Sequence, residues 1–345
     1  MRVLVTGGTG YLGSHTVAAL LREGHEVTIL ARSPDRVPPA LQPVGVAPEA
    51  IATALGDVTE PESVEKAMAG HDAVLHAASV FSMDTRKGDL MRQVNVTGAE
   101  TVLGTAERLG LDPIVLVSSE LALLPPVNGA VLTPQSPTGK APTPYCWSKA
   151  EAEDVARRFQ ERGVPVVSVM PSSLWGPDDP HFGEGVRWCR NVLKRYYPFV
   201  MNGGMHISDV RDVAKVNAAV LEPGRGPRSY LFTGHYLTMK EIQHTLGSLT
   251  GRRIGSLTLP RSFLAGFGRM ADWFQRRMKG RLPWTYEGIW VLNTRARCDD
   301  SKTRTELGVE ARDIRETFAD TVRWLVEVGS LTPKEAGRLG GRDAA

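Results

Sequence analysis

The chain has 345 residues, 41 basic and 38 acidic side chains, and a net charge of +3. This length favours a large α/β unit with a smaller partner, and the near-neutral charge balance argues against a nucleic-acid partner. Three widely spaced cysteines without a Cys-x-x-Cys pair argue against a metal site or a disulfide framework and predict a reducing, cytoplasmic compartment. We expect no transmembrane segment, because no apolar stretch approaches the ~20 residues that span a bilayer.

The first thirteen residues join a short apolar run to a glycine-rich turn. Val3 to Val5 suits a buried strand, Gly7, Gly10 and Gly13 follow at three-residue spacing, and an amphipathic segment begins directly after them. Glycines at such a turn let a pyrophosphate reach the backbone amides and the positive end of the helix. The spacing is a variant of Gly-x-Gly-x-x-Gly, so an ordinary strand-to-helix turn is the alternative. Its position favours dinucleotide binding.

Farther along, predicted strands alternate with predicted helices. Strands are expected over 26–31, 51–55, 73–77, 114–117, 164–169 and 230–233, and helices from 59, over 90–109 and over 145–162. This alternation is typical of an α/β fold with a Rossmann-type, doubly wound parallel sheet. We predict an NADP-binding domain of residues 1–175 plus about 208–235. The rest, about 176–207 and 236–330, is expected to form a smaller C-terminal substrate-binding domain.

Four segments stand outside this alternation. The proline-rich stretch 124–144 is expected to be a loop, either an ordered wall or a mobile lid. Residues 261–281 predict a basic amphipathic helix, which packs on its own protein or, less readily, touches a membrane surface. Thr238 and Glu241 form a capping-box pattern before another helix. Residues 337–345 have little to bury and should be frayed.

The strongest chemical pattern combines Ser119, Tyr145 and Lys149. Tyr145 and Lys149 are four residues apart, so they share one face of a helix. A phenol has an ordinary pKa of about 10, and a nearby ammonium helps it to exchange a proton at neutral pH. Ser119 follows a predicted strand, where its hydroxyl could hold the same substrate oxygen. These residues predict proton transfer coupled to hydride transfer.

Several motifs together resemble the extended short-chain dehydrogenase/reductases over nearly the whole chain. They are Thr6 to Gly13, Gly56 to Val58, His76 to Ala78, Asn95 to Gly98, Ser118-Ser119, Tyr145-x-x-x-Lys149, Pro171 to Pro177, Asp209 to Ala214, Asp299 to Lys302 and Glu306 to Gly308. The resemblance implies that Tyr145 is the acid/base, Lys149 its partner and ribose ligand, and Ser119 the ligand of the substrate oxygen. It also implies a homodimer.

The resemblance further implies the cofactor ligands. The turn would contribute Gly7, Thr9, Gly10, Tyr11, Leu12 and Gly13. Asp57 and Val58 would meet the adenine, Ala77, Ala78 and Ser118 would line the cofactor beside Tyr145 and Lys149, and Pro171, Ser172, Ser173 and Leu174 would approach the nicotinamide amide.

The end of the second predicted strand bears on the choice between NAD and NADP. NAD enzymes of this kind place an acidic residue there for the ribose hydroxyls, whereas this chain has Ala31 followed by Arg32. An arginine favours the additional phosphate of NADP and can stack on adenine. A solvated arginine is the alternative, and Asp35 is a nearby complication. We predict NADP(H), with NAD(H) as the alternative.

These observations predict an NADP(H)-dependent oxidoreductase that interconverts a carbonyl and a secondary alcohol on a small, apolar substrate. The pattern is nearest to dihydroflavonol-reductase-like and 3β-hydroxysteroid-dehydrogenase-like members. A nucleotide-sugar epimerase or dehydratase is the alternative, although the single acid Glu120 beside Ser119 argues against dehydration. A non-catalytic cofactor-binding regulator is a further alternative, and the complete Ser119, Tyr145 and Lys149 set argues against it. We expect structural roles for His76, His206, Asp209, Arg211 and Asp212.

Overall fold

The computed structural model describes residues 1–82, 84–196, 199–201, 203–259, 266, 270, 286–294 and 296–341. The chain divides into two compact units. The first contains Met1–Ser172, Val210–Thr233 and Ala296–Glu310, and the second contains Ser173–Asp209, Gly234–Arg295 and Ala311–Ala345. The segment 296–310 therefore packs with the first unit, although the sequence pattern grouped it with the predicted substrate-binding residues.

The first unit is built on a seven-stranded parallel sheet in the order β10-β6-β5-β4-β1-β2-β3. Its strands are β1 (Arg2–Thr6), β2 (Glu26–Ala31), β3 (Ala52–Leu55), β4 (Ala73–His76), β5 (Ile114–Val117), β6 (Val166–Pro171) and β10 (Arg228–Phe232). β1 pairs with β2 on one side and with β4 on the other, so the strand order reverses beside β1. This arrangement confirms the expected Rossmann-type α/β fold and creates the switch point where such sheets bind ligands.

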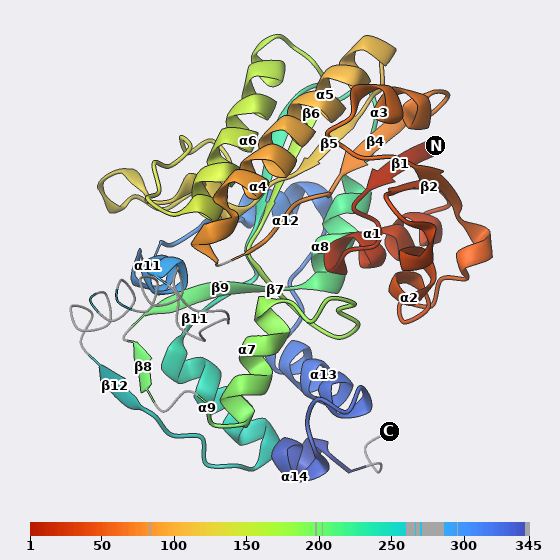
Figure 1. Ribbon diagram of the computed structural model, residues 1–345. Coiled ribbons are helices and arrows are strands. Elements are labelled where there is room, and N and C mark those ends of the chain that lie inside the picture. The colour runs from red at the N-terminus through yellow and green to blue at the C-terminus, as the bar shows by residue number, and fades with distance from the viewer. Residues whose placement is uncertain are drawn as a thin grey trace. The chain divides into compact units, whose positions relative to one another are not determined.

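Helices cover both faces of this sheet, as expected for strands made of continuous apolar runs (Figure 1). On one face α3 (Pro61–Met68), α5 (Gly98–Leu109) and α6 (Pro144–Glu161) pack together, and on the other α1 (Tyr11–Arg22) packs on α8 (Val210–Ala219). Further helical segments of this unit are α2 (Val37–Leu41), α4 (Gly88–Arg92), α12 (Ser301–Leu307), η1 (Pro34–Arg36), η2 (Pro48–Ala50), η3 (Thr85–Lys87), η5 (Glu120–Leu123) and η6 (Val127–Gly129).

Two predicted helices differ in detail from the structure. The helix expected over 90–109 begins at Gly88 and contains the π-helical segment η4 (Gln93–Thr97) between α4 and α5. The helix expected from Thr59 begins at Pro61, and its N-cap residue is Glu60, which makes no side-chain cap. The Thr59 hydroxyl donates to Asp57 Oδ1 at 2.8 Å. The proline in the first turn of this helix is as predicted.

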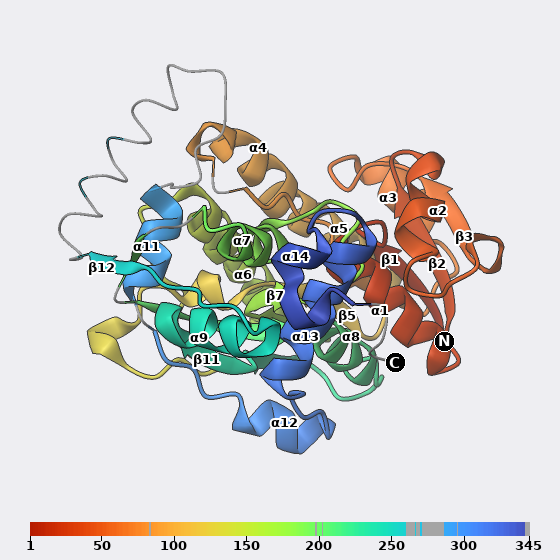
Figure 2. The same cartoon turned by 90° about the horizontal axis from the view of Figure 1, so that it is seen from below.

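The second unit has small sheets and a helical core of its own. One sheet has the order β11-β9-β7, with β7 (Ser173–Trp175), β9 (Gly204–Asp209) and β11 (His235–Thr238), and the other pairs β8 (Phe199–Met201) with β12 (Leu257–Leu259). The helices α7 (Glu184–Leu193), α9 (Met239–Thr250), α13 (Ile314–Glu327) and α14 (Pro333–Ala336) gather together (Figure 2), and α11 (Tyr286–Thr294) packs on β9. Their core includes Trp175, Ile207, Ile242, Phe318 and Leu325.

The remaining expectations for this unit have mixed outcomes. The capping box of Thr238 and Glu241 is confirmed at the start of α9. Residues expected to be frayed include Gly337–Leu339, which instead forms the 3₁₀ turn η7, with Leu339 packed against the core of the second unit. The helix predicted over 261–281 lies outside the described residues except at positions 266 and 270. None of the described helices combines the length and apolarity needed to cross a membrane.

The glycine turn depends on close packing between β1 and α1. A side chain on Gly13 would overlap the Gly7 carbonyl and approach Gly8 Cα, so only glycine lets the first turn of α1 lie against the end of β1. Gly104, on α5, is a helical glycine with open space around it, since its nearest non-local atom is Phe159 Cζ at 3.9 Å from an added Cβ.

Gly13→Ala is therefore expected to lower the free energy of unfolding by about 1–3 kcal/mol, because backbone must move to admit the methyl group. Gly104→Ala is the matched control and is expected to raise stability by up to about 1 kcal/mol through its better helix propensity. Urea unfolding of both variants measures these effects. Equal stability in the two variants would contradict the packing argument.

Candidate active site

The glycine turn forms a cradle with backbone groups at its surface. Gly7 has a φ of +75°, and an added Cβ would lie 2.5 Å from the backbone nitrogen of Ala78. Gly10 is the N-cap of α1, and its missing side chain leaves the first-turn amides without a side-chain cap. An uncapped helix N-terminus beside a close backbone approach is suited to a pyrophosphate. The turn therefore fits the cofactor group that the sequence predicts for it.

A buried pair joins the turn to the end of β4. Thr6 Oγ1 lies 2.7 Å from His76 Nδ1 and accepts a hydrogen bond from the Ala78 amide at 3.3 Å. Burial, with a smaller effect of the Lys149 charge, lowers the pKa of His76 to about 3. The imidazole is thus neutral at ordinary pH. Through Thr6 it helps to fix the backbone of Ala77 and Ala78 beside the glycine turn. The expected structural role of His76 agrees with these contacts.

The predicted proton-transfer residues lie in the first unit on two packed elements. Tyr145 and Lys149 are on α6, one turn apart, and both are buried. Ser119 is the N-cap of η5, which packs against α6, and its hydroxyl accepts a hydrogen bond from the Leu121 amide at 3.2 Å. Ser119 therefore follows the end of β5 and lies in an element packed against α6, the helix of Tyr145 and Lys149.

Lys149 is an ammonium group buried beside the sheet. Its Nζ donates to the carbonyl of Val117 at 3.3 Å, and only 6% of the residue is exposed. Burial lowers the pKa of Lys149 to about 8, while the negative charge of Glu153 acts in the opposite direction. The lysine therefore remains mostly charged at neutral pH, as a partner for a phenolate must be.

Two features beside Tyr145 are not evident from the sequence pattern. The Phe81 ring packs edge-on against the Tyr145 ring with centroids 4.6 Å apart, and 44% of Phe81 is exposed. Asn95, in the π-helical segment, holds the chain around Val80 and donates to Ser148 Oγ at 3.0 Å. π-Helical turns are frequent at functional sites, but periodicity does not reveal them because they add one residue to the turn.

The end of β2 places a cation near Asp57, one of the residues predicted to meet the adenine. Arg32 follows β2 with 68% of its side chain exposed, and its Nη1 lies 3.9 Å from Asp57 Oδ2. Asp57 Oδ1 also accepts hydrogen bonds from the amide and hydroxyl of Thr59. An ion pair this exposed contributes little to stability. Arg32 is therefore accessible at the carboxyl edge of the sheet.

The predicted nicotinamide-side residues divide between the two units. Pro171 ends β6, and Ser172 donates through its hydroxyl to the Thr233 carbonyl at 3.1 Å, both within the first unit. Ser173 and Leu174 begin β7 of the second unit. Asp300 accepts a hydrogen bond from the Thr233 amide at 2.9 Å and so fixes the backbone that Ser172 contacts.

The proline-rich loop is tied to the first unit at several points. Leu132 exchanges backbone hydrogen bonds with Arg297 and Asp299, and Gly139 donates to the Ala122 carbonyl at 2.8 Å. Thr138 Oγ1 donates to Asp154 Oδ1 of α6 at 2.7 Å. These bonds hold the base of the loop. Exposed Val127 and Val131 lie in the same loop.

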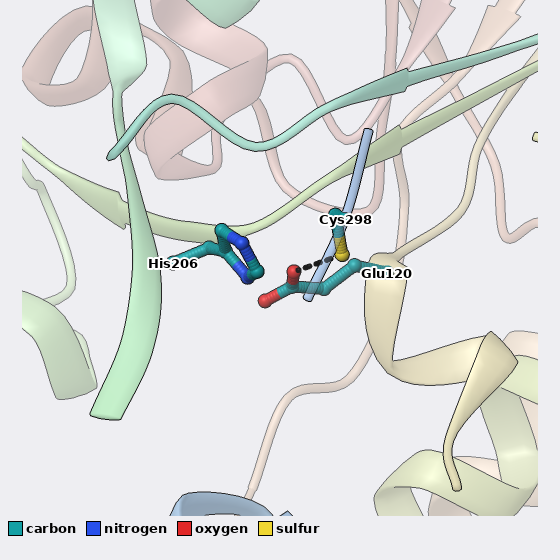
Figure 3. A group of neighbouring side chains, drawn as sticks. All are labelled: Glu120, His206 and Cys298. Atoms are coloured by element: carbon teal, nitrogen blue, oxygen red, sulfur yellow. Dashed lines mark hydrogen bonds between the residues drawn. The ribbon is translucent and has the colours of Figure 1, made fainter. Parts of the chain in front are cut away.

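The remaining acidic and histidine candidates have structural partners. Glu120 is buried, and the Cys298 thiol donates to its Oε2 at 3.5 Å (Figure 3). His206, also labelled in Figure 3, is on β9 of the second unit and packs edge-on against Tyr236. Asp209 pairs with Arg312 at 3.4 Å, and Asp212 lies 3.5 Å from Lys215. The last two pairs agree with the structural role expected for these acids.

Comparisons with known proteins support the same class. Residues 3–231 match the model of the NAD dependent epimerase/dehydratase family. The chain is 31% identical to sterol demethylase protein B of Methylococcus capsulatus over 340 residues, which covers 96% of this chain and all of that protein. It is 29% identical to a putative dihydroflavonol 4-reductase of Synechocystis, covering 94% of each. The crystal structure of gox2253 has the same fold, with a TM-score of 0.80, 24% identity, and coverage of 96% of this chain and 99% of that one.

The chain belongs to the NAD dependent epimerase/dehydratase family, within the extended short-chain dehydrogenase/reductases. The resemblance drawn from its motifs is thereby confirmed. Oxidoreduction with a nucleotide cofactor is the chemistry of this class, and the relatives include reductases and dehydrogenases. The protein is an enzyme of that family.

The buried His76 gives the fold a defined response to acid. The native pKa of about 3 is far below the ordinary value of 6.5, so the unfolded chain binds a proton first as pH falls. The free energy of unfolding should fall from about pH 6.5 towards pH 3, by up to about 1.4 kcal/mol per pH unit from this residue. Urea unfolding of wild type and His76→Asn at several pH values measures this term. The pH slope should be smaller in the variant, and an identical slope would contradict the assignment.

Proposed function

We propose that the protein is an NADP(H)-dependent oxidoreductase that interconverts a carbonyl and a secondary alcohol on a small, apolar substrate. The observation that carries this proposal is the buried Lys149 ammonium one helical turn from Tyr145, with Ser119 on the element packed against them. This set suits a proton transfer at oxygen, and the family membership supplies the accompanying oxidoreduction.

In reduction, Tyr145 would donate its phenolic proton to the carbonyl oxygen of the substrate. Lys149 would stabilise the phenolate that remains, because an opposite charge nearby favours the ionised form of the phenol. Ser119 would donate a hydrogen bond to the same substrate oxygen and orient the carbonyl. In the reverse direction Tyr145 would accept the proton from the alcohol.

The residues present suit a nicotinamide dinucleotide. Gly7, Gly10 and Gly13 would hold its pyrophosphate on the uncapped α1 terminus, and Lys149 would bind a ribose hydroxyl. The bound cofactor would supply the hydride. Preference for the 2′-phosphate form is supported by the exposed Arg32 at the end of β2 and by the absence of a carboxylate at Ala31.

An apolar substrate is supported by the surface around Tyr145. The Phe81 ring packs against the phenol and is itself partly exposed, so a planar apolar substrate could pack on this ring while its carbonyl meets Tyr145. Two relatives, sterol demethylase protein B and a putative dihydroflavonol 4-reductase, are named for ring-containing compounds of low polarity, which also supports such a substrate.

Tyr145→Phe tests the proton-transfer role. It should lower kcat for NADPH-dependent reduction of apolar ketones at least ~100-fold, because the proton donor is lost, while the Kd of NADPH stays close to wild type. Tyr196→Phe is the control, since Tyr196 is 58% exposed. Stopped-flow absorbance and fluorescence titration provide the two readouts. Sugar-nucleotide isomerisation without net NADPH consumption would instead identify an epimerase.

Arg32→Ala tests the cofactor preference. Loss of a charge-assisted contact to the 2′-phosphate should raise the Kd of NADPH about tenfold or more and leave that of NADH nearly unchanged. Ala31→Asp is the complementary variant and should favour NADH by restoring a ribose-binding carboxylate. Fluorescence titration with both nucleotides gives the ratio of the two dissociation constants. A ratio that Arg32→Ala does not change would contradict the NADP(H) assignment.

A further inference from the structure

The buried face of α6 carries a carboxylic acid that does not belong to the set of Ser119, Tyr145 and Lys149. Glu153 is one helical turn after Lys149 and has no exposed surface. A charge in such a position is costly unless other groups compensate for it. A glutamate facing solvent would support the helix equally well. Helix formation therefore does not explain why Glu153 is buried.

One compensating group is Arg157, a further turn along the helix. Its Nε lies 3.3 Å from Glu153 Oε1, and 24% of its side chain is exposed. The same guanidinium donates through Nη2 to the Ser136 carbonyl of the proline-rich loop at 2.8 Å. Arg157 thus bridges the buried acid and the base of that loop.

Other polar groups face the carboxylate from the sheet. The Ser118 and Ser168 hydroxyls lie beside Glu153 and, together with Arg157, oppose the increase in its pKa that burial causes. Three buried oxygen atoms make no well-aligned hydrogen bond to any of the described residues: Ser118 Oγ, Ser168 Oγ and Glu153 Oε2. The acid is buried with one strong partner and a polar but incompletely bonded surrounding. Burial raises the pKa of Glu153, and the positive charge of Arg157 is the largest effect that opposes this increase.

We propose that Glu153 is a positioning residue whose buried carboxylate keeps Lys149 charged, and that Arg157 holds Glu153 ionised while docking the proline-rich loop. Lys149, Glu153 and Arg157 follow one another at four-residue intervals on α6. Arg157 contacts both Glu153 and the carbonyl of Ser136. These contacts connect the charge of Lys149 to the proline-rich loop, which is expected to be an ordered wall or a mobile lid. The part of this inference that concerns catalysis rests on the proposed function.

The charged groups on the neighbouring elements do not stabilise the Lys149 ammonium in the same way. From β4, His76 faces Lys149 as a neutral imidazole. From α4, Arg92 pairs with Glu151 at 3.3 Å, and from α5, Glu100 pairs with Arg158 at 3.5 Å, both at partly or largely exposed positions. From η5, Glu120 accepts from Cys298. Glu153 is the acid whose charge favours the protonated form of Lys149.

Glu153→Gln tests the proposal in the full-length, cofactor-free protein. The pKa of the Lys149 ammonium is followed by NMR with isotopically labelled lysine, its signal being identified by its loss in Lys149→Met. Removing the negative charge should lower that pKa by about one pH unit, because the ammonium loses its opposite charge. The alkaline limb of the kcat profile should move to lower pH by the same amount.

Glu151→Gln is the matched control, because it removes one acid from the same helix at a site paired with Arg92. It should leave the pKa of Lys149 unchanged. Asp154→Asn removes the Thr138 contact to the loop and should also leave it unchanged. If Glu153→Gln does not fold, Arg157→Gln provides the test, since Glu153 then takes up a proton at higher pH and the pKa of Lys149 falls as well.

An unchanged Lys149 pKa in folded Glu153→Gln, or in Arg157→Gln when the first variant does not fold, would overturn the proposal. The NMR titration does not depend on turnover. Failure to reduce any carbonyl would therefore count against the proposed function alone, whereas a normal pH profile in an active Glu153 variant would count against the role of Glu153 alone.

Discussion

The burial of a lysine charge at the carboxyl edge of the sheet organises the first unit of this protein. An ammonium group out of water is unstable without compensation, and Lys149 receives it from the carbonyl at the end of β5 and from the carboxylate of Glu153. Glu153 in turn requires Arg157, and Arg157 reaches the proline-rich loop. One buried charge thus relates a strand end, a helix face and a loop that are distant in sequence.

The second constraint is the absence of side chains at the glycine turn. Because Gly13 lies against the Gly7 carbonyl, α1 starts directly at the end of β1 and presents its amides at the switch point of the sheet. Thr6 and His76 continue this edge across to β4 without adding a charge. A neutral, closely packed edge on one side and a charged lysine on the other suit a cofactor that has both a pyrophosphate and a ribose.

Family membership defines the chemistry more closely than the substrate. Reductases, dehydrogenases and epimerases share the sheet and the family pattern, and the relatives of this chain include all three. The second unit has its own core around Trp175 and Phe318, and its sequence carries no motif for one compound class. Substrate choice in such folds depends on the shape of surfaces rather than on a fixed set of residues.

The amino-acid sequence by itself determined the fold class and the proposed proton-transfer set. Apolar runs give strands, and a spacing of four residues places Tyr145 and Lys149 on one helix face, because both depend on local backbone geometry. Only the tertiary structure decided that Phe81 packs on Tyr145, that His76 is neutral and that Glu153 is buried beside Arg157. The burial of these residues and the contact between Phe81 and Tyr145 come from segments far apart in the chain, so no local pattern contains them. The four-residue spacing of Glu153 and Arg157 is visible in the sequence, but the burial that makes their pairing necessary is not.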